Sequence, residues 1–275
     1  MDVSADASRA RRVGCVSFIN AKPLIEGLAS GPDPEVRFAV PAELLGKLEA
    51  GEVDLALCPV IDYHRSQTEL VIVPAGGIGC RGTTLTVRLF SRVPIDRITR
   101  LHADRDSHTS VALAQVLLHR LHRLRPEMVP YQAREATGEP PESMLLIGDK
   151  VVTSSPRAIE YPHQLDLGEA WHELTGLPFV FAVWMARKDA ELGDLPDRLA
   201  RQRERNAGRV EQIARRYAAG HGWPAPLATR YLGEILRYEV GEAELEAIER
   251  FSREAAALGL IERARPLRVA GRDGL

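Results

Sequence analysis

Residues 13–24 carry the pattern that most restricts the fold. An apolar run ends in a polar corner at Asn20, and Pro23 then opens a helical stretch. Proline is favoured in the first helical turn because the amide it lacks would have no partner there. A strand that turns into a helix N-terminus is the repeating unit of open α/β proteins, whose ligands collect at the carboxyl ends of strands. The stretch therefore predicts a strand over 12–18, a helix over 24–28 and a ligand-binding corner at Asn20.

The same rhythm continues to residue 60. Residues 36–40 alternate as a strand, and residues 41–50 place leucines at helical spacing before Gly51, which suits a left-handed helix end. Residues 54–60 then form an apolar run that closes on a proline. Strands that alternate with short helices argue for an α/β fold with a parallel sheet covered by helices.

The remainder of the chain predicts a second α/β unit followed by helices. A glycine-rich turn is expected over 76–82, and Thr109 or Ser110 is expected to cap a helix that begins at Val111. The other expected elements are strands at 71–75, 84–90, 128–131, 144–149 and 177–184, and helices at 111–124, 197–217, 225–236 and 243–258.

This order of elements fits a two-lobed protein whose chain crosses twice between the lobes. We expect the crossings near residues 90–92 and 184–187. Residues 1–91 with 187–275 would form lobe I, on which the last helices pack back, and residues 92–186 would form lobe II. A cleft between two lobes is where such a protein would hold a small molecule.

Composition argues against several classes of partner. At a net charge of −2, the chain has no excess of positive charge for nucleic acid or an acidic membrane surface. Residues 1–12 lack the apolar core of a secretory signal, and no run approaches the roughly 20 apolar residues of a membrane span. The three cysteines, an odd number without CxxC spacing, indicate neither a disulfide framework nor a zinc site. We therefore expect a cytoplasmic protein in a reducing compartment.

Two polar corners each contain a candidate binding residue and an ordinary alternative. At the first, Ser17 and Asn20 follow a strand, although an asparagine in such a turn often only mimics backbone hydrogen bonding. At the second, Gly148 and Asp149 end a strand, where glycine permits a close approach of backbone to ligand. Asp149 is equally suited to capping the next segment. The local sequence leaves both alternatives open.

A third corner opens the helix that is expected from Val111. Ser107, His108, Thr109 and Ser110 combine three hydroxyls with the free amides of a helix N-terminus, which together make a seat for a carboxylate or phosphate. An ordinary N-cap would need only one of these hydroxyls. His108 could act as an acid or base, but a single histidine beside a helix start is more often a surface residue.

Several motifs with known chemistry are absent from the sequence. It contains no P-loop, no G-x-G-x-x-G, no H-E-x-x-H and no G-x-S-x-G. The eight histidines show no metal-ligand spacing beside acidic residues. We expect no metal and no nucleotide cofactor, and the residues alone predict a two-lobed α/β protein that binds a small anion.

Five motifs follow one another in a recognisable order along the chain. They are VSFINAKPL at 16–24, GEVDLALCPV at 51–60, SHTS at 107–110, LIGD at 146–149, and DLGEAW at 166–171 with TGLPFVFAVW at 175–184. Each motif is weak alone, and their order and spacing make the set specific. Together they resemble one enzyme family, chorismate dehydratase of the futalosine route to menaquinone, and the resemblance extends from about residue 12 to about residue 260.

The resemblance implies a type II periplasmic-binding-protein-like fold used as a cytoplasmic enzyme. The family is a lyase that converts chorismate into 3-(1-carboxyvinyloxy)benzoate and water. Loss of the ring hydroxyl and the neighbouring ring proton aromatises the ring, so no cofactor is expected. The enzyme has to hold a dianion, align the proton and the hydroxyl, and stabilise the departing oxygen. The matching positions hold no strong base, and we hypothesise that the substrate's own enolpyruvyl carboxylate takes the ring proton.

Two catalytic roles follow from matching positions. Asn20 matches the family's asparagine after the first strand and would hydrogen-bond the ring hydroxyl or orient the ring. Thr86 stands where the family pattern has a serine and would donate a second hydrogen bond. Thr86 adds a methyl group and a stiffer χ1, and Thr83 follows Gly82 where family members have proline. Both departures bear on the shape of that wall.

The remaining matches concern binding of the substrate. Ser107, Thr109 and Ser110, with the local amides, would seat one carboxylate of chorismate. Gly148 and Asp149 would line the opposite wall of the cleft.

Three other functions are compatible with parts of this pattern. The sister enzyme that makes 1,4-dihydroxy-6-naphthoate shares the fold and uses a histidine, for which His108 is the candidate in a polar corner. A solute-binding protein of a transporter would need an export signal or lipid anchor, and a LysR-type ligand-sensing domain would need a DNA-binding segment before the first strand; neither is visible. The expected partner is a small molecule, chorismate, and a homodimer is compatible with the sequence.

Overall fold

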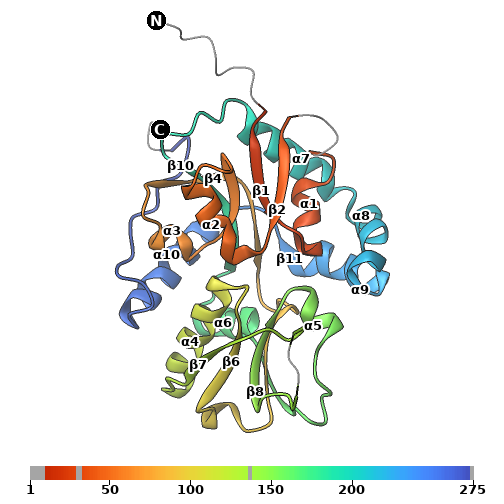
Figure 1. Cartoon of the computed structure of the whole chain (residues 1–275), viewed down its shortest axis with the longest axis vertical. Helices are drawn as coiled ribbons and strands as arrows, with labels where there is room; N and C mark the ends of the chain where they lie inside the picture. Colours follow the sequence, from red (N-terminus) through yellow and green to blue (C-terminus); the bar gives the residue numbers. More distant parts are fainter. Residues whose placement is uncertain (1–9, 29–32, 136–137, 273–275) are drawn as a thin grey trace, which may run out of the picture.

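The chain forms two lobes, each built around one β-sheet (Figure 1). The computed structural model describes residues 10–28, 33–135 and 138–272. The sheet of lobe I has six strands in the order β11-β4-β10-β3-β1-β2, and the sheet of lobe II has five in the order β7-β6-β8-β5-β9. The expected two-lobed α/β architecture is therefore confirmed.

Lobe I contains the first part of the chain and most of its C-terminal helices. Its strands are β1 (Arg12–Val16), β2 (Glu35–Ala39), β3 (Leu55–Pro59), β4 (Leu70–Cys80), β10 (Phe179–Arg187) and β11 (Leu236–Arg237). Its helices are α1 (Lys22–Ile25), α2 (Pro41–Glu49), α3 (Asp62–Arg65), α7 (Leu195–Ala207), α8 (Val210–Tyr217), α9 (Ala225–Arg230) and α10 (Glu242–Ala257). Short helical turns are η1 (Ile19–Ala21), η4 (Ala219–His221) and the π-helical η5 (Tyr231–Ile235).

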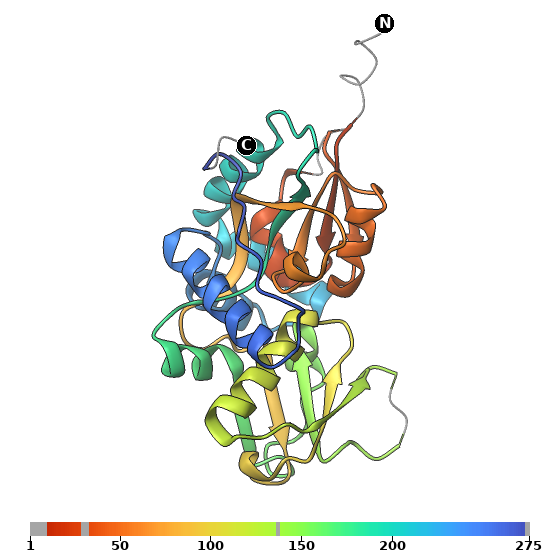
Figure 2. The ribbon, with the colours of Figure 1, turned by 90° about the vertical axis from the view of Figure 1, so that its left-hand side faces the viewer.

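Lobe II is formed by the middle of the chain. Its strands are β5 (Val87–Ser91), β6 (Arg100–Asp104), β7 (Glu127–Tyr131), β8 (Ser143–Ile147) and β9 (His163–Asp166). Its helical segments are η3 (Ile95–Arg97), α4 (His108–His122), α5 (Asp149–Thr153) and α6 (Leu167–Thr175). Figure 2 shows α10 along the side of lobe I, with one end at the boundary where it contacts α4.

The first three strands follow the predicted βαβαβ pattern. β1 pairs in parallel with both β2 and β3, and every residue of β3 is buried, as a strand covered on both faces requires. The sheet is mixed, however, because β10 returns from lobe II and pairs antiparallel with β3 and β4. The prediction of a parallel sheet thus applies to the first part of lobe I.

The glycine-rich segment expected as a turn over 76–82 is mostly strand, since β4 continues to Cys80. A Cβ atom on Gly77 would lie 2.7 Å from the carbonyl oxygen of Ala182, and one on Gly79 would lie 2.7 Å from that of Phe179. Glycine here permits a close approach of β10 to β4, rather than a change of chain direction.

Strand pairing places both crossings between the lobes earlier than the sequence predicts. The chain enters lobe II between Cys80 and Val87, because β5 pairs with β8 and β9. It returns between Thr175 and Phe179, because β10 belongs to the sheet of lobe I. The expected crossings at 90–92 and 184–187 each came one strand late, since an apolar strand does not reveal which sheet it joins.

Three boundaries of helices also differ from expectation. Ser107 caps α4, and its hydroxyl accepts a hydrogen bond from the amide of Ser110 at 3.2 Å, whereas Thr109 or Ser110 was expected as the cap. The helix expected over 197–217 is interrupted at Gly208. The helix expected over 225–236 becomes α9, the π-helical η5 and the first residue of β11. In the described part of the chain, no helix is long and apolar enough to cross a membrane.

His64 at the end of α3 fastens the C-terminal segment to lobe I. Its Nδ1 accepts the amide proton of Arg265 at 3.0 Å, so Nε2 carries the ring proton and donates to the Ser252 hydroxyl at 2.5 Å. The Ser252 hydroxyl in turn donates a hydrogen bond to the carbonyl oxygen of Ile248 at 2.7 Å. Burial, together with the nearby Arg265 guanidinium, lowers the pKa of His64 from 6.5 to about 4.

This histidine is expected to make the stability of the protein depend on pH. The unfolded chain takes up the proton near pH 6.5, whereas the folded protein takes it up only near pH 4. Because the folded pKa is the lower one, acid favours unfolding. The free energy of unfolding should fall by up to about 3 kcal/mol as the pH drops from 6.5 to 4, and be unaffected by this group above pH 6.5. Urea unfolding at several pH values in this range measures the effect.

The variant His64→Asn is the control, since asparagine can still accept the proton of the Arg265 amide but does not titrate in this range. It should show a shallower loss of stability between pH 6.5 and 4 than the wild-type protein. Equal slopes for the two proteins would contradict the assignment.

Candidate functional site

A pocket lies between the two lobes. Lobe I contributes the carboxyl ends of β1 and β3, the corner at Asn20 and the π-helical η5. Lobe II contributes the N-terminus of α4 and Gly148 at the end of β8, and the crossing segment before β5 adds Thr84 and Thr86. The pocket thus lies where strands end and helices begin, which is where ligand sites form in open sheets.

Asn20 lies in the pocket, in the turn η1 that follows β1. Its Oδ1 atom is buried and has no hydrogen-bond partner within the described residues. A buried polar atom without a partner is unusual and costly. The atom is therefore free to accept a hydrogen bond from a ligand, for example from a hydroxyl group.

Thr86 and Tyr231 form a buried pair of hydroxyls in the pocket wall. Thr86 Oγ1 and the Tyr231 hydroxyl lie 2.6 Å apart, and both side chains are nearly inaccessible to solvent. The Tyr231 ring stacks on the indole of Trp223, with centroids 4.8 Å apart. Burial raises the pKa of Tyr231 above its usual value, and hydrogen bonding with the side chains of Thr86 and Asn20 partly opposes this. Tyr231 remains a neutral phenol.

The crossing segment is fixed by the carboxylate of Asp166, at the end of β9. Asp166 accepts hydrogen bonds from the amides of Thr84 at 2.9 Å and Leu85 at 2.8 Å, and from the Thr83 hydroxyl at 2.9 Å. Leu85 has a positive φ of 63°, which is rare for a residue with a side chain. This tight turn directs Thr84 and Thr86 into the pocket.

The same contacts account for Thr83, which stands where the resemblance leads one to expect proline. A proline could not form the hydrogen bond that the Thr83 hydroxyl donates to Asp166. The departure from the family pattern thus has a partner of its own in this chain, and the wall it supports remains well fixed.

The N-terminus of α4 brings the three predicted hydroxyl residues to the pocket: Ser107, Thr109 and Ser110. Thr109 Oγ1 lies 3.4 Å from the amide of Ile61 in lobe I, a long hydrogen bond across the cleft. Within the described residues, the pocket lining includes no Lys, Arg, His, Asp or Glu. An anion bound here would be held by amides, hydroxyls and the helix dipole.

Ser17, His108 and Asp149, expected to bind substrate, do not line the pocket. Ser17 is exposed, since its neighbours Val16 and Phe18 face the pocket and successive side chains of an extended segment point to opposite sides.

His108 and Asp149 instead connect the lobes. His108 Nδ1 lies 2.8 Å from the buried carboxylate of Asp62 in lobe I. The carboxylate of Asp149 accepts hydrogen bonds from Trp223 Nε1 at 2.9 Å and pairs with His221 Nδ1 at 2.7 Å. Gly148, next to Asp149, does line the pocket, and its φ of 59° suits glycine.

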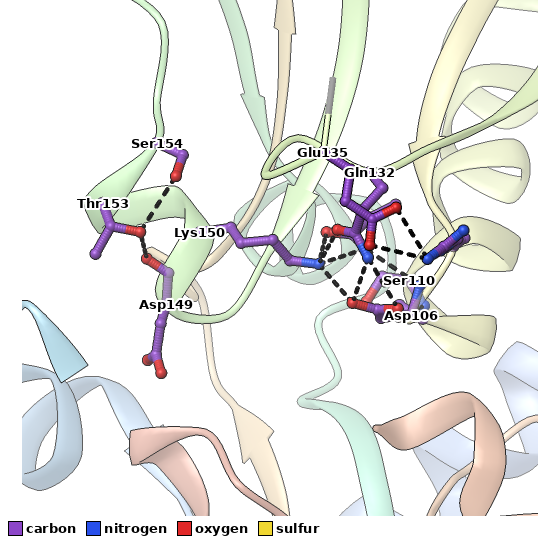
Figure 3. Close-up of polar contacts among 11 residues, drawn as sticks. Asp106, Ser110, Gln132, Glu135, Asp149, Lys150, Thr153 and Ser154 are labelled. Carbon is purple, nitrogen blue, oxygen red and sulfur yellow. Dashed lines mark hydrogen bonds and ion pairs between the residues drawn. The ribbon is translucent and has the colours of Figure 1, made fainter. Parts of the chain in front are cut away.

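A buried ion-pair cluster lies behind the α4 corner, where β6, β7 and β8 end (Figure 3). Lys150 Nζ lies 2.6 Å from Asp104, 2.8 Å from Asp106 and 3.3 Å from Gln132 Oε1. Figure 3 shows the Lys150 side chain pointing toward this cluster while the neighbouring Asp149 side chain points away from it. Burial raises the pKa of Asp104, and the hydrogen bond from Lys150 opposes the shift. The cluster fixes the segment that leads into Ser107.

Comparison with known proteins assigns the chain to a family. A family model described as menaquinone biosynthesis matches residues 11–257. A protein of Thermus thermophilus named chorismate dehydratase is 31% identical over 90% of this chain and 95% of its own length. The chain belongs to the menaquinone biosynthesis family that includes chorismate dehydratases. A second member of this family, the chorismate dehydratase of Campylobacter jejuni, is 25% identical over 90% of this chain and 98% of its own length.

Solved structures show the fold of this family member. The protein AF1704 of Archaeoglobus fulgidus superimposes with a TM-score of 0.68 at 17% identity, over 93% of this chain and all of that one. The periplasmic aliphatic sulphonate binding protein SsuA of Escherichia coli gives a TM-score of 0.62 at 15% identity, over 96% of this chain and 94% of its own. The fold is that of the periplasmic binding proteins, as the resemblance implied.

Sequence reasoning missed Tyr231, Asp166 and Trp223 as parts of the site. Asp166 was visible as the first residue of a family motif, but nothing in that motif indicates that its carboxylate reaches the crossing segment. Tyr231 lies in a segment that the sequence predicts as plain helix. Among the described residues, no group of three or more His, Cys, Asp and Glu side chains could hold a metal ion.

Proposed function

We propose that this family member is a chorismate dehydratase, which converts chorismate into 3-(1-carboxyvinyloxy)benzoate and water. The observation that carries the proposal is the pocket itself. It places an unpartnered amide oxygen of Asn20 and the hydroxyl of Thr86 in one cavity with the N-terminus of α4. Relatives named chorismate dehydratase, at 31% and 25% identity, support the same reaction. The three cysteines are free thiols, and we place the reaction in the reducing cytoplasm.

The proposed orientation of chorismate follows from the donors and acceptors on the two sides. The ring carboxylate would be bound at the N-terminus of α4, by the hydroxyls of Ser107, Thr109 and Ser110 and nearby amides. The ring hydroxyl would lie between Asn20, which accepts its proton in a hydrogen bond, and Thr86, which donates one to its oxygen. Apolar residues such as Phe18, Leu57 and Phe181 would enclose the ring and exclude water.

The lining offers no acid or base of ordinary strength for the proton transfer. Tyr231 is the one residue among the described lining that titrates as an acid, and burial keeps it protonated. We therefore assign the base to the substrate's enolpyruvyl carboxylate. It takes the proton of the neighbouring ring carbon, the electron pair of that C–H bond enters the ring, and the C–O bond breaks with its pair on oxygen. The departing hydroxide gains a proton and leaves as water, and the reaction involves no net oxidation.

Incubation of the purified protein with chorismate tests the proposal directly. The expected result is formation of the dehydrated product, identified by chromatography and mass, at a rate well above spontaneous decay. An analogue with an ester in place of the enolpyruvyl carboxylate should bind but react far more slowly, because it lacks the base. Normal turnover of the ester would refute the substrate-base step.

Two other outcomes would direct the assignment elsewhere. Chorismate that stays intact and unbound would point to the sister enzyme making 1,4-dihydroxy-6-naphthoate, although His108 pairs with Asp62 outside the pocket lining and so offers no support for it. Chorismate that binds without turnover would favour a non-catalytic solute-binding protein for a small carboxylate.

A further inference from the structure

The hydroxyl of Tyr231 is a buried polar group that the steps above leave without a role. It belongs to the π-helical η5, and its position is fixed by stacking on Trp223 and by the 2.6 Å contact with Thr86 Oγ1. The Tyr231 side chain lines the same pocket as Thr86 and Asn20. π-helical turns that interrupt regular helices are frequently found at functional sites.

The direction of the bond between the two hydroxyls decides what Thr86 can do. A phenol is a stronger acid than an aliphatic alcohol, and so is the better donor of the pair. Burial raises the pKa of Tyr231, so the phenol keeps the proton that it donates. When Tyr231 donates to Thr86 Oγ1, the Thr86 proton is left to point into the pocket. If Thr86 instead donated to the Tyr231 oxygen, its proton would point into the pocket wall and would not be available to a ligand.

We propose that Tyr231 is a positioning residue, which donates its hydrogen bond to Thr86 Oγ1 and so directs the Thr86 hydroxyl proton toward the departing ring oxygen of the substrate. The inference rests on the proposed dehydration. As the C–O bond breaks, its electron pair moves to oxygen, and the Thr86 hydroxyl donates a hydrogen bond to the charge that develops there. The proton that completes the water molecule comes from the ring carbon by way of the enolpyruvyl carboxylate. Tyr231 and Thr86 both keep their own protons.

Contacts between the lobes link this arrangement to closure of the cleft. Trp223, on which Tyr231 stacks, donates its Nε1 proton to Asp149 of lobe II. The indole is thus held between the two lobes, with Tyr231 on one face. Asp149 was expected from the sequence to contact substrate. It instead holds the Trp223 indole, on which Tyr231 stacks, and so acts on the pocket indirectly.

The variant Tyr231→Phe tests the role, because it removes the hydroxyl and keeps the ring that stacks on Trp223. With chorismate as substrate, kcat should fall by about 10- to 100-fold while KM changes less than about threefold, since the interaction acts mainly in the transition state. In a Thr86→Ala background the same substitution should cause almost no further loss, because its target is gone. In a Thr86→Ser background, which keeps a hydroxyl, the loss should reappear.

Tyr238→Phe is the matched control. Tyr238 is another tyrosine of lobe I with a buried hydroxyl, but within the described residues this hydroxyl has no hydrogen-bond partner and does not line the pocket. Its kcat should equal that of the wild-type protein, and thermal unfolding of all variants checks that they are folded.

Three results would overturn the inference. They are an unchanged kcat in Tyr231→Phe, an equal loss in Tyr238→Phe, and a loss by Tyr231→Phe that multiplies fully with that of Thr86→Ala. Each of these leaves the proposed dehydration intact, because the wild-type protein turns chorismate over in all of them. A wild-type protein that leaves chorismate unchanged would overturn both the dehydration and the role of Tyr231 in it.

Discussion

Replacing Asn20 by aspartate is expected to lower kcat/KM for chorismate by a factor of about 10³ or more. The change keeps the size of the side chain but replaces the amide group by a carboxylate. The new charge would lie in a pocket whose described lining carries no Lys, Arg or His to balance it, and whose proposed ligand is a dianion. It would also remove the amide protons that help lower the pKa of Tyr231. Charge repulsion against the dianion should raise KM, and the added negative charge beside the departing ring oxygen, on which negative charge develops, should lower kcat.

Steady-state kinetics with chorismate, followed by product formation, measures the effect. Ser17→Ala is the control, since Ser17 lies three residues away, is exposed and does not line the pocket. Its kinetic constants should match those of the wild-type protein. An Asn20→Asp variant with wild-type kcat/KM would refute both the catalytic role of Asn20 and the proposed orientation of the substrate.

Replacing Lys150 by methionine is expected to destabilise the protein by about 3–5 kcal/mol. Lys150 is 2% exposed and its ammonium lies between the carboxylates of Asp104 and Asp106 (Figure 3). Methionine fills much of the same volume but leaves Asp104, which is 1% exposed, as a buried charge without its cation. Removing one partner of a buried ion pair destabilises a protein far more than replacing both partners by apolar residues, because the remaining charge stays desolvated and unpaired.

Urea unfolding followed by circular dichroism measures this loss. Lys188→Met provides the comparison, since Lys188 pairs with Glu69 at 3.2 Å on the surface, where both side chains are exposed. Surface pairs contribute at most about 1 kcal/mol, so this variant should be nearly as stable as the wild-type protein. Adding Asp104→Asn to Lys150→Met should recover part of the loss by removing the unpaired charge. Equal stabilities of Lys150→Met and Lys188→Met would contradict this account.

Local sequence patterns were sufficient to predict those pocket residues that lie together in one continuous stretch of the chain. The strand, corner and proline of residues 13–24 placed Asn20, and three hydroxyls beside a helix start placed Ser107, Thr109 and Ser110. In these cases the backbone direction at a strand end or helix start determines where the side chain points. The same local pattern did not reveal that Ser17, in the same stretch, faces away from the pocket.

Residues whose roles depend on distant partners could not be placed from the sequence. Asp149 reads locally as a residue at a strand end, but its partners His221 and Trp223 lie more than 70 positions away. Tyr231 gains its role from Thr86, which is 145 positions distant. The crossings between the lobes were likewise predicted too far along the sequence. The hydrogen bonding between strands that defines them depends on tertiary contacts, which no local window of sequence contains.

The two histidine–carboxylate contacts between the lobes have a consequence for which step limits the rate of turnover. Asp62 with His108, and Asp149 with His221, join lobe I to lobe II at two points of the cleft. A ligand enclosed between the lobes can leave only after the lobes part, and parting them separates both pairs. In the proposed dehydration, the contacts that help to keep bulk solvent from the ring would therefore also retain the product. Because the proposed aromatisation is strongly downhill, we expect separation of the lobes, and not the chemical step, to limit the rate of the cycle.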